Sequence, residues 1–475
     1  MTGLATPRTP EEFARVHFGG AQLGDARLAR RAMLVVACMA RRPGASIPRL
    51  HDDPAAAKGA YRLFAHHAAT PDALQGAHRR LVRQQASAPG TTCLLLEDTT
   101  TVDYSGGEPI EGLGPVGAGA PGAQGFHLHS VLAAIVPAGG LASEHARRAP
   151  LALLGLLHQE YHLRVPRPQG EPPSSSFHTR QRERESQLWE RSTQALGPAP
   201  EGVRWIRVAD RGADIHASLM AYVAQGHGFV VRACHDRALG GKKGRLFAAA
   251  RSWEALGAER LALRARPGQG ARQATLSLSA GRVVLPSPQV PGRSAGAGPA
   301  LECTLVRAWE KDPPPGAKAL EWLLLCDEPV TGLEGAREVL ARYVARWVAE
   351  EFHKALKTGM GAERLQLESG ERLFAAVALM SVVALRLVDL REHARLAPAA
   401  PARESGLDEL RLRLLERQAR RKLATVGEVA LAVARLGGHM NRKGDGPPGW
   451  RTLWLGMAYL EAMVQGALLA GGTCG

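Results

Sequence analysis

Two apolar runs, each leading to an aspartate, constrain the fold of this chain more than any other feature. The first lies within residues 91–104 and leads to Asp98; the second, within residues 203–209, leads to Asp210 and a glycine-containing turn. A continuous apolar run of this kind is typical of a strand buried on both faces. Polar groups at the carboxyl ends of strands in open α/β sheets gather into ligand sites. We therefore predict an α/β fold, with both aspartates at or near strand ends.

The rest of the chain divides around these two runs. Residues 127–137 and 151–164 have strand patterns, a polar linker follows from 166 to about 177, and a charged helix then runs to about residue 196. Residues 105–125 are rich in Gly and Pro and predict a loop, not a nucleotide-binding site, because no Gly-Lys-Ser/Thr follows. We predict a helical domain (1–88), an α/β domain (89–395) with a β-rich insertion (about 228–330), and a helical C-terminal region (396–475).

Residues 342–359 predict the end of a long helix. The capping-box spacing of Thr331 and Glu334 suggests its start, and Gly359 is a natural stop. At about 100° per residue, one face combines an acid with cations and a phenol: Tyr343, Arg346, Glu350, Lys354 and Lys357. A packing face lies opposite and holds Val348, Phe352 and Leu356. The charged face is either a solvated surface or a site for an anionic partner.

The charge of the chain favours an anionic partner. The net charge is +15 and the pI is about 10, which points to nucleic acid or an anionic membrane. No run is expected to reach the length of a membrane span, and the most apolar stretch, 373–385, predicts a core helix. The N-terminus does not resemble a signal peptide, and six scattered cysteines without a CxxC pair indicate no zinc site and a reduced compartment. Cytoplasmic nucleic acid is the leading partner class.

Clustered arginines near the N-terminus fit the same partner. Arg27, Arg30 and Arg31 follow Asp25 at the start of a predicted helix, and a later helix, capped at Thr70, carries a second set: Arg79, Arg80 and Arg83. A DNA-binding module and a solvated basic face explain this pattern equally well, because no specific helix-turn-helix signature is present.

Two strand-end aspartates and one helix glutamate make a candidate metal-ligand set: Asp98, Asp210 and Glu350. Oxygen-only ligands select Mg²⁺ or Mn²⁺ over zinc. Two such ions can stabilise both the attacking and the leaving oxygen of a phosphoryl transfer.

The sequence resembles the insertion-sequence-four family of DDE transposases, and the group of the Tn-five transposase in particular. Tyr343, Arg346, Glu350 and Lys357 match the Y-(2)-R-(3)-E-(6)-K signature of that family. Collinear similarity extends over roughly residues 13–465 and includes the strings around Asp98 and Asp210 and the late residues 434–438.

The resemblance implies an RNase H-like catalytic core, with a β-rich insertion and flanking helical domains, in which Asp98, Asp210 and Glu350 bind metal. It implies a Mg²⁺-dependent enzyme, with Mn²⁺ also expected to support activity. Its chemistry is cleavage of transposon ends through a hairpin intermediate, followed by joining of the 3′ ends to target DNA. By position in the motifs, the residues holding DNA near the cut would be Arg232, Trp322, Tyr343, Arg346, Lys354 and Lys357, while Arg27, Arg30 and Arg31 would read the end sequence.

The family also implies a homodimer in the synaptic complex, formed through the C-terminal region, and double-stranded DNA rather than a membrane as partner. We expect a cytoplasmic, nucleoid-associated bacterial protein. His353 is interpreted as structural. Two alternatives stay open: a non-catalytic DNA-binding regulator, and a nuclease that does not transfer strands.

Overall fold

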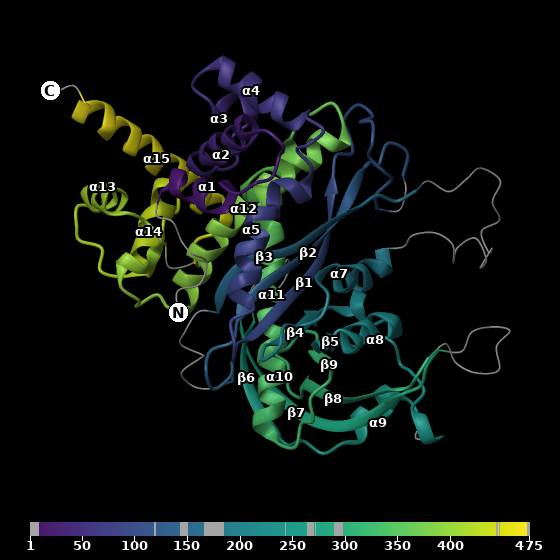
Figure 1. Cartoon of the computed structure of the whole chain (residues 1–475). Helices are drawn as coiled ribbons and strands as arrows, with labels where there is room; N and C mark the ends of the chain where they lie inside the picture. Colours follow the sequence, from purple (N-terminus) through teal and green to yellow (C-terminus); the bar gives the residue numbers. More distant parts are fainter. Residues whose placement is uncertain are drawn as a thin grey trace.

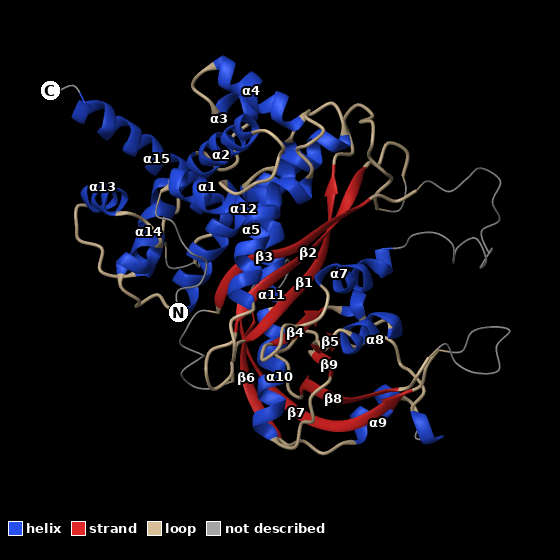
Figure 2. Ribbon diagram, in the orientation of Figure 1, coloured by secondary structure: helices blue, strands red, loops and turns tan. Residues whose placement is uncertain are grey.

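The computed structural model describes residues 9–117, 120–142, 151–165, 185–242, 244–263, 270, 272–288, 298–442, 445 and 447–472. Its centre is a nine-stranded mixed sheet with the order β3-β2-β1-β4-β5-β9-β8-β7-β6 (Figures 1 and 2). The strands are β1 (Thr92–Asp103), β2 (Gly125–Ile135), β3 (Ala152–His162), β4 (Arg204–Ala209), β5 (Gly228–Arg232), β6 (Gly257–Leu263), β7 (Arg272–Leu285), β8 (Leu301–Glu310) and β9 (Glu321–Cys326). β1, β4 and β5 are parallel, and every other neighbouring pair is antiparallel.

The two predicted strands are present as β1 and β4, but Asp98 does not end its strand. β1 continues to Asp103 because β2 pairs with it along its whole length, placing Asp98 opposite Ser130. The parallel pairing of β1 with β4 stops earlier, at Leu96 opposite Val208. Asp98 and Asp210 therefore both lie two positions beyond the last parallel pair, at the same level of the sheet.

Residues 228–330 are rich in strands, as expected, and these strands continue the central sheet. β5 belongs to the parallel part and pairs with β9, which joins the antiparallel strands β8, β7 and β6. One helix, α9 (Leu246–Ser252), interrupts them. The predicted linker 166–177 lies outside the described residues.

The N-terminal helices begin where the sequence indicates. The Asp25 carboxylate accepts from the Arg27 N–H at 2.7 Å to start α2, and the Thr70 hydroxyl accepts from the Ala73 N–H to start α5. Ala32 is fully buried on the packing side of α2. The helices of this region are α1 (Pro10–Phe18), α2 (Ala26–Arg41), α3 (Ile47–Leu50), α4 (Pro54–Phe64) and α5 (Pro71–Ala86).

Helices cover both faces of the β1–β3 part of the sheet. α11 (Trp347–Lys354) and α12 (Gly370–Leu396) pack on the face that carries Asp98 and Ser130. α5 runs along the edge strand β3, and its later residues Val82 and Ala86 join the apolar cluster of the opposite face. The opposite face, which carries Glu97, is covered by α7 (Leu188–Leu196) and, beside it, α8 (His216–Ala224) (Figure 1). Neighbouring residues of β1 thus face different helical layers.

The predicted long helix is divided into three parts. It begins after Gly332, which makes no side-chain cap, so the capping box expected from Thr331 is wrong. α10 (Leu333–Ala345) and α11 are separated at Arg346, and a π-helical turn, Ala355–Gly359, ends the segment near the predicted stop.

Three helices form the C-terminal region: α13 (Glu409–Ala419), α14 (Val426–Leu436) and α15 (Trp450–Gly472). α14 starts with a complete capping box between Thr425 and Glu428. The first part of α15 packs against α14, and its C-terminal end projects away from the rest of the chain (Figure 1).

Among the described residues, α12 and α15 are long and apolar enough to span a membrane by length and composition, contrary to our expectation that no run reaches that length. The apolar window of α12 is 89% buried, as in the core helix of a soluble protein.

Candidate active site

Arg346 joins two of the predicted acids. It lies where α10 ends and α11 begins, and its guanidinium contacts Asp98 Oδ1 at 3.4 Å and the carboxylate of Glu350. Burial would lower the pKa of Arg346, but Asp98, Tyr343, Glu350 and Asp210 together raise it above its usual value. All three predicted acids therefore act on one buried cation.

Asp98 has a second neighbour from α11. His353 Nδ1 lies 3.3 Å from Asp98 Oδ2. Burial alone would raise the pKa of Asp98, but His353 and Arg346 outweigh burial and hold it below its ordinary value. The interpretation of His353 as merely structural is therefore incomplete. Its position three residues after Glu350, on the same side of a helix, was a signal that sequence reasoning could have used.

Asp210 follows β4 directly and shapes the turn beyond it. Its carboxylate accepts from the Gly212 N–H at 2.8 Å and caps a 3₁₀ turn, Arg211–Ala213. Glycine is required at 212 because a Cβ there would lie 2.4 Å from the Trp189 ring. This tight turn fixes Asp210 at the end of its strand.

A cleft of about 1180 Å³ opens in front of Asp210 and Glu350, and Asp98 lies behind Arg346, outside its lining. Its lining includes six of the predicted site residues: Asp210, Arg232, Trp322, Tyr343, Arg346 and Glu350. Trp322 meets the Tyr343 ring edge-on at 5.4 Å between centroids. Tyr343 is only 6% exposed, so our expectation that it lies among displayed charges, away from the packing side, is wrong.

Neither Lys354 nor Lys357 is among the residues that line this cleft. Lys354 pairs with Glu351 at 3.3 Å, whereas Lys357 pairs with Glu363 and donates to the carbonyl of Thr101, both at 2.8 Å. The predicted charged face therefore holds for Tyr343, Arg346 and Glu350, which share the cleft wall, but not for the two lysines. The π-helical turn from residue 355 changes the rotation per residue before Lys357.

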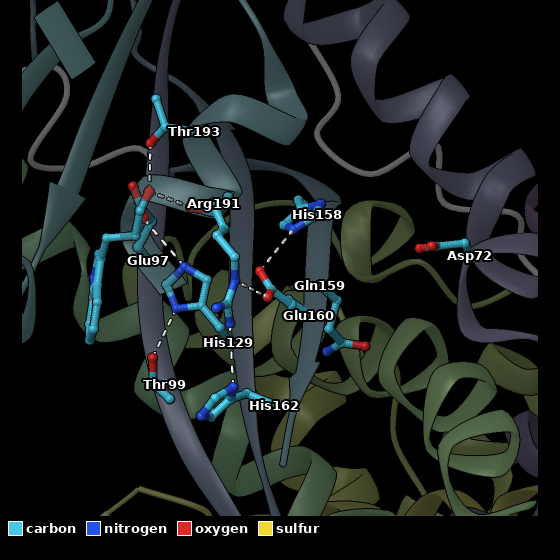
Figure 3. A network of polar contacts seen from close by, with 12 residues as sticks. Asp72, Glu97, Thr99, His129, His158, Gln159, Glu160, His162, Arg191 and Thr193 are labelled. Atoms are coloured by element: carbon cyan, nitrogen blue, oxygen red, sulfur yellow. Dashed lines mark hydrogen bonds and ion pairs between the residues drawn. The ribbon is translucent and has the colours of Figure 1, made fainter. Parts of the chain in front are cut away.

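A buried polar network supports β1 from behind. Glu97 and Arg207 form an ion pair in which both side chains are fully buried, and His129 links Glu97 to Thr99, with 2.8 Å between the histidine Nδ1 and the threonine hydroxyl (Figure 3). Burial would raise the pKa of Glu97, but Arg207 and His129 hold it below its ordinary value. Sequence reasoning missed this network, because nothing in the sequence showed Glu97 and Arg207 to be adjacent.

One further cluster has ligand-type atoms: those of Asp214, Cys234 and His235 lie within 4.8 Å of one another, the one such group of three among the described residues. The sequence pattern of scattered cysteines did not reveal this grouping, which forms only in the fold. Asp214 is nevertheless occupied, since it accepts from the backbone N–H groups of Cys234 and His235 and pairs with Arg237. We interpret the cluster as a clamp on the loop after β5.

The N-terminal arginines fall into two classes. Arg27, Arg30 and Arg31 are exposed on α2, and Arg31 packs over Gly59 of α4. The second set serves the fold instead: Arg79 pairs with Asp72, while Arg80 and Arg83 donate to the carbonyls of Gly20 and Leu196. The first set alone presents an open basic surface on α2.

Two family models match the chain at its two ends. The model described as Transposase DNA-binding matches residues 10–69, which include α1–α4 and the exposed arginines. The model described as Transposase Tn5 dimerisation domain matches residues 382–473. The two matches together support a Tn5-like transposase.

The matches also support a broad class of activity and of partner. A Tn5-like transposase is a DNA-processing enzyme, with DNA and a second copy of itself as partners, and the insertion-sequence-four assignment is consistent with the matches. The cytoplasmic location expected from the sequence is consistent with this class, whereas nucleoid association stays a prediction. The dimerisation match begins inside α12, whereas we placed the C-terminal region from residue 396.

Proposed function

We propose that the chain is a cut-and-paste transposase that cleaves transposon ends by metal-dependent phosphoryl transfer through a hairpin and joins the 3′ ends to target DNA. The observation that carries this proposal is the approach of Asp98 and Glu350 to one cation, Arg346, at the wall of a large cleft that also holds Asp210. An RNase H-like core is part of the proposal. Its support is that two acids lie at one level of adjacent parallel strands and the third comes from a helix packed on that sheet.

The donor types of Asp98, Asp210 and Glu350 suit a divalent metal, but in this structure Arg346 lies between Asp98 and Glu350, and the three carboxylates are not all within 4.8 Å of one another. Asp98 and Glu350 already hold a positive group between them, and the set offers only carboxylate oxygens, the donors that Mg²⁺ and Mn²⁺ prefer. Asp98, Asp210 and Glu350 would hold the ions. Bound there, two ions would lower the barrier by stabilising the attacking and leaving oxygens of the phosphate.

The protein's own groups would orient the DNA. Arg232 and Arg346 line the cleft and would bind phosphates, and Trp322 offers an aromatic face for an unstacked base. Tyr343 meets Trp322 edge-on and would fix its orientation. Lys354, 52% exposed, stands outside the described cleft and would reach DNA that extends beyond it. Lys357 would first have to leave Glu363.

Cleavage of the element's own ends tests the proposal. The substrate is DNA carrying the inverted repeats found beside the gene, with Mg²⁺ or Mn²⁺ added. We expect the wild-type chain to cut and join these ends, and Glu350→Ala to bind them but leave them uncut. Normal cleavage by Glu350→Ala would refute the metal-ligand assignment.

Two other outcomes identify the alternatives. End binding without metal-dependent nicking would indicate a non-catalytic regulator. Cleavage without joined products would indicate a nuclease that lacks strand transfer.

A further inference from the structure

His353 lies between the carboxylate of Asp98 and the buried hydroxyl of Ser130. Its ring is 4% exposed, with Nδ1 toward Asp98 Oδ2 at 3.3 Å and Nε2 3.2 Å from the Ser130 hydroxyl. Nδ1 lies within ion-pair distance of Asp98 Oδ2 but lacks hydrogen-bond geometry to it or to any other described residue, so a hydrogen bond to Asp98 requires this contact to tighten when the site is occupied. Ser130 is fully buried and therefore cannot act as a nucleophile.

A chain of buried amides fixes the direction of these contacts. Gln75 Nε2 donates to Gln159 Oε1 at 2.8 Å, and Gln159 Nε2 donates to the Ser130 hydroxyl at 3.0 Å. Ser130 thus has its own hydrogen left to donate to His353 Nε2. Histidine that accepts at Nε2 carries its proton on Nδ1, the atom facing Asp98.

The Gln75 end of this chain is itself anchored. Gln75 Nε2 also donates to the Ala378 carbonyl of α12 at 3.0 Å, and its Oε1 accepts from Arg79 of α5 at 2.5 Å. Gln75 and Gln159 are both buried, so water cannot replace these partners. The tautomer of His353 is therefore set by fixed groups of α5, α12 and the sheet.

We propose that His353 is a positioning residue: its Nδ1–H orients the Asp98 carboxylate for metal binding, and Ser130 holds the tautomer that makes this possible. The inference rests on the proposed metal site. Partners that orient a metal ligand in this way typically change metal affinity by about 10–100-fold when they are removed.

Two isosteric variants isolate the donor. His353→Asn keeps an N–H near the position of Nδ1, whereas His353→Leu has the same shape without a donor. Both lose the Ser130 contact and the packing of the ring against Phe352. A purely structural role would affect both variants alike, so the difference between them measures the donor to Asp98.

The experiment measures binding of Mn²⁺ to the full-length chain. The electron paramagnetic resonance signal of free Mn²⁺ reports how much of the ion remains unbound. We expect His353→Leu to weaken binding about 10–100-fold and His353→Asn to restore most of it. Ser130→Ala, a smaller change, should weaken binding in the same direction. Unfolding curves for each variant establish that the chain is folded.

The outcomes separate this inference from the proposed function. Equal Mn²⁺ affinity of the Asn and Leu variants would overturn the role of His353, whether both match the wild type or both are weak. If Asp98→Ala loses Mn²⁺ binding in the same experiment, the assignment of Asp98 to the metal site still stands and only the role of His353 is rejected. If the wild type does not bind Mn²⁺, or Asp98→Ala binds it equally well, the metal site and this inference both fail.

Discussion

Adjacent residues of β1 have separate roles because a strand points successive side chains to opposite faces. Asp98 faces α11, where it contacts Arg346 and His353, whereas Glu97 is fully buried against Arg207 on the other side. The sequence indicated Asp98, because an acid after an apolar run stands out. It could not indicate the role of Glu97, because the partner lies 110 positions away (207 − 97) and only the pairing of β1 with β4 brings the two together.

Arg207→Met should destabilise the chain strongly. It leaves the buried carboxylate of Glu97 without its ion-pair partner, and such losses typically cost about 3–5 kcal/mol. The free energy of unfolding, measured with urea at pH 7, tests this expectation. In the double variant with Glu97→Leu, much of the loss should be recovered because no uncompensated charge remains. A double variant as unstable as the sum of both single variants would contradict this account.

The pH dependence of the same variant has a definite sign. In the wild type, the pKa of Glu97 is lowered below its ordinary value of 4.5, so the pair contributes stability above that pH and loses it as the pH falls. Without Arg207, burial raises this pKa instead, and protonation relieves the cost. The stability difference between wild type and Arg207→Met should therefore shrink from pH 7 toward pH 4.5. A constant difference would argue against the ion pair as its cause.

At the scale of elements, strand and helix positions were largely predictable and helix continuity was not. Capping residues such as Asp25 and Thr70 identified helix starts correctly because their hydrogen bonds are local. The break at Arg346 is not local: Arg346 bonds to Asp98 across the fold. A helical wheel grouped Tyr343 correctly with Arg346 and Glu350, but it could not show that Trp322 from β9 packs on Tyr343 and buries it.

Gly456→Ala should separate α14 from α15. A Cβ at this position would lie 1.8 Å from the Val433 carbonyl oxygen, and backbone cannot give way as a flexible side chain can. We expect a loss of about 1–3 kcal/mol or more. Gly466→Ala in the same helix is the matched control, because a Cβ there meets nothing within 4 Å and alanine favours helix by up to about 1 kcal/mol. Thermal unfolding and the protease sensitivity of α15 compare the two variants. If both variants behave alike, the contact between α14 and α15 tolerates a side chain at residue 456.

For the whole molecule, net charge predicted the class of partner, and the structure narrows where that partner would bind. The excess of positive charge is +15, but many arginines are used internally, such as Arg83 against the Leu196 carbonyl. Arg30 is exposed on α2, within the residues matched by the DNA-binding model. Composition cannot separate these two uses, because the distinction depends on which backbone carbonyls and acids each arginine meets after folding.

The salt dependence of end binding should report Arg30 directly. Each phosphate contact contributes about −0.9 to the slope of log K against log salt, because binding releases condensed counterions. We expect Arg30→Ala to make this slope shallower by about one contact. Arg413→Ala is the control, since this arginine is 60% exposed on α13 in the region matched by the dimerisation model. Fluorescence anisotropy over a salt series measures both; an unchanged slope for Arg30→Ala would exclude a phosphate contact at this residue.

Assembly should depend on the exposed apolar surface of α15. Leu469 is 73% exposed, Tyr459 is 59% exposed, and both lie in the region matched by the dimerisation model. A carboxylate buried at such a contact without a partner is strongly unfavourable. We therefore expect Leu469→Glu to retain binding of a single end and to lose the complex that pairs two ends. Gln465→Glu is the control, because it adds the same charge at another exposed position of α15. An electrophoretic mobility-shift assay with DNA ends of two lengths detects complexes that contain both ends and compares the two variants. Normal pairing by Leu469→Glu would mean that the chains meet through another surface, whereas loss in both variants would point to charge alone.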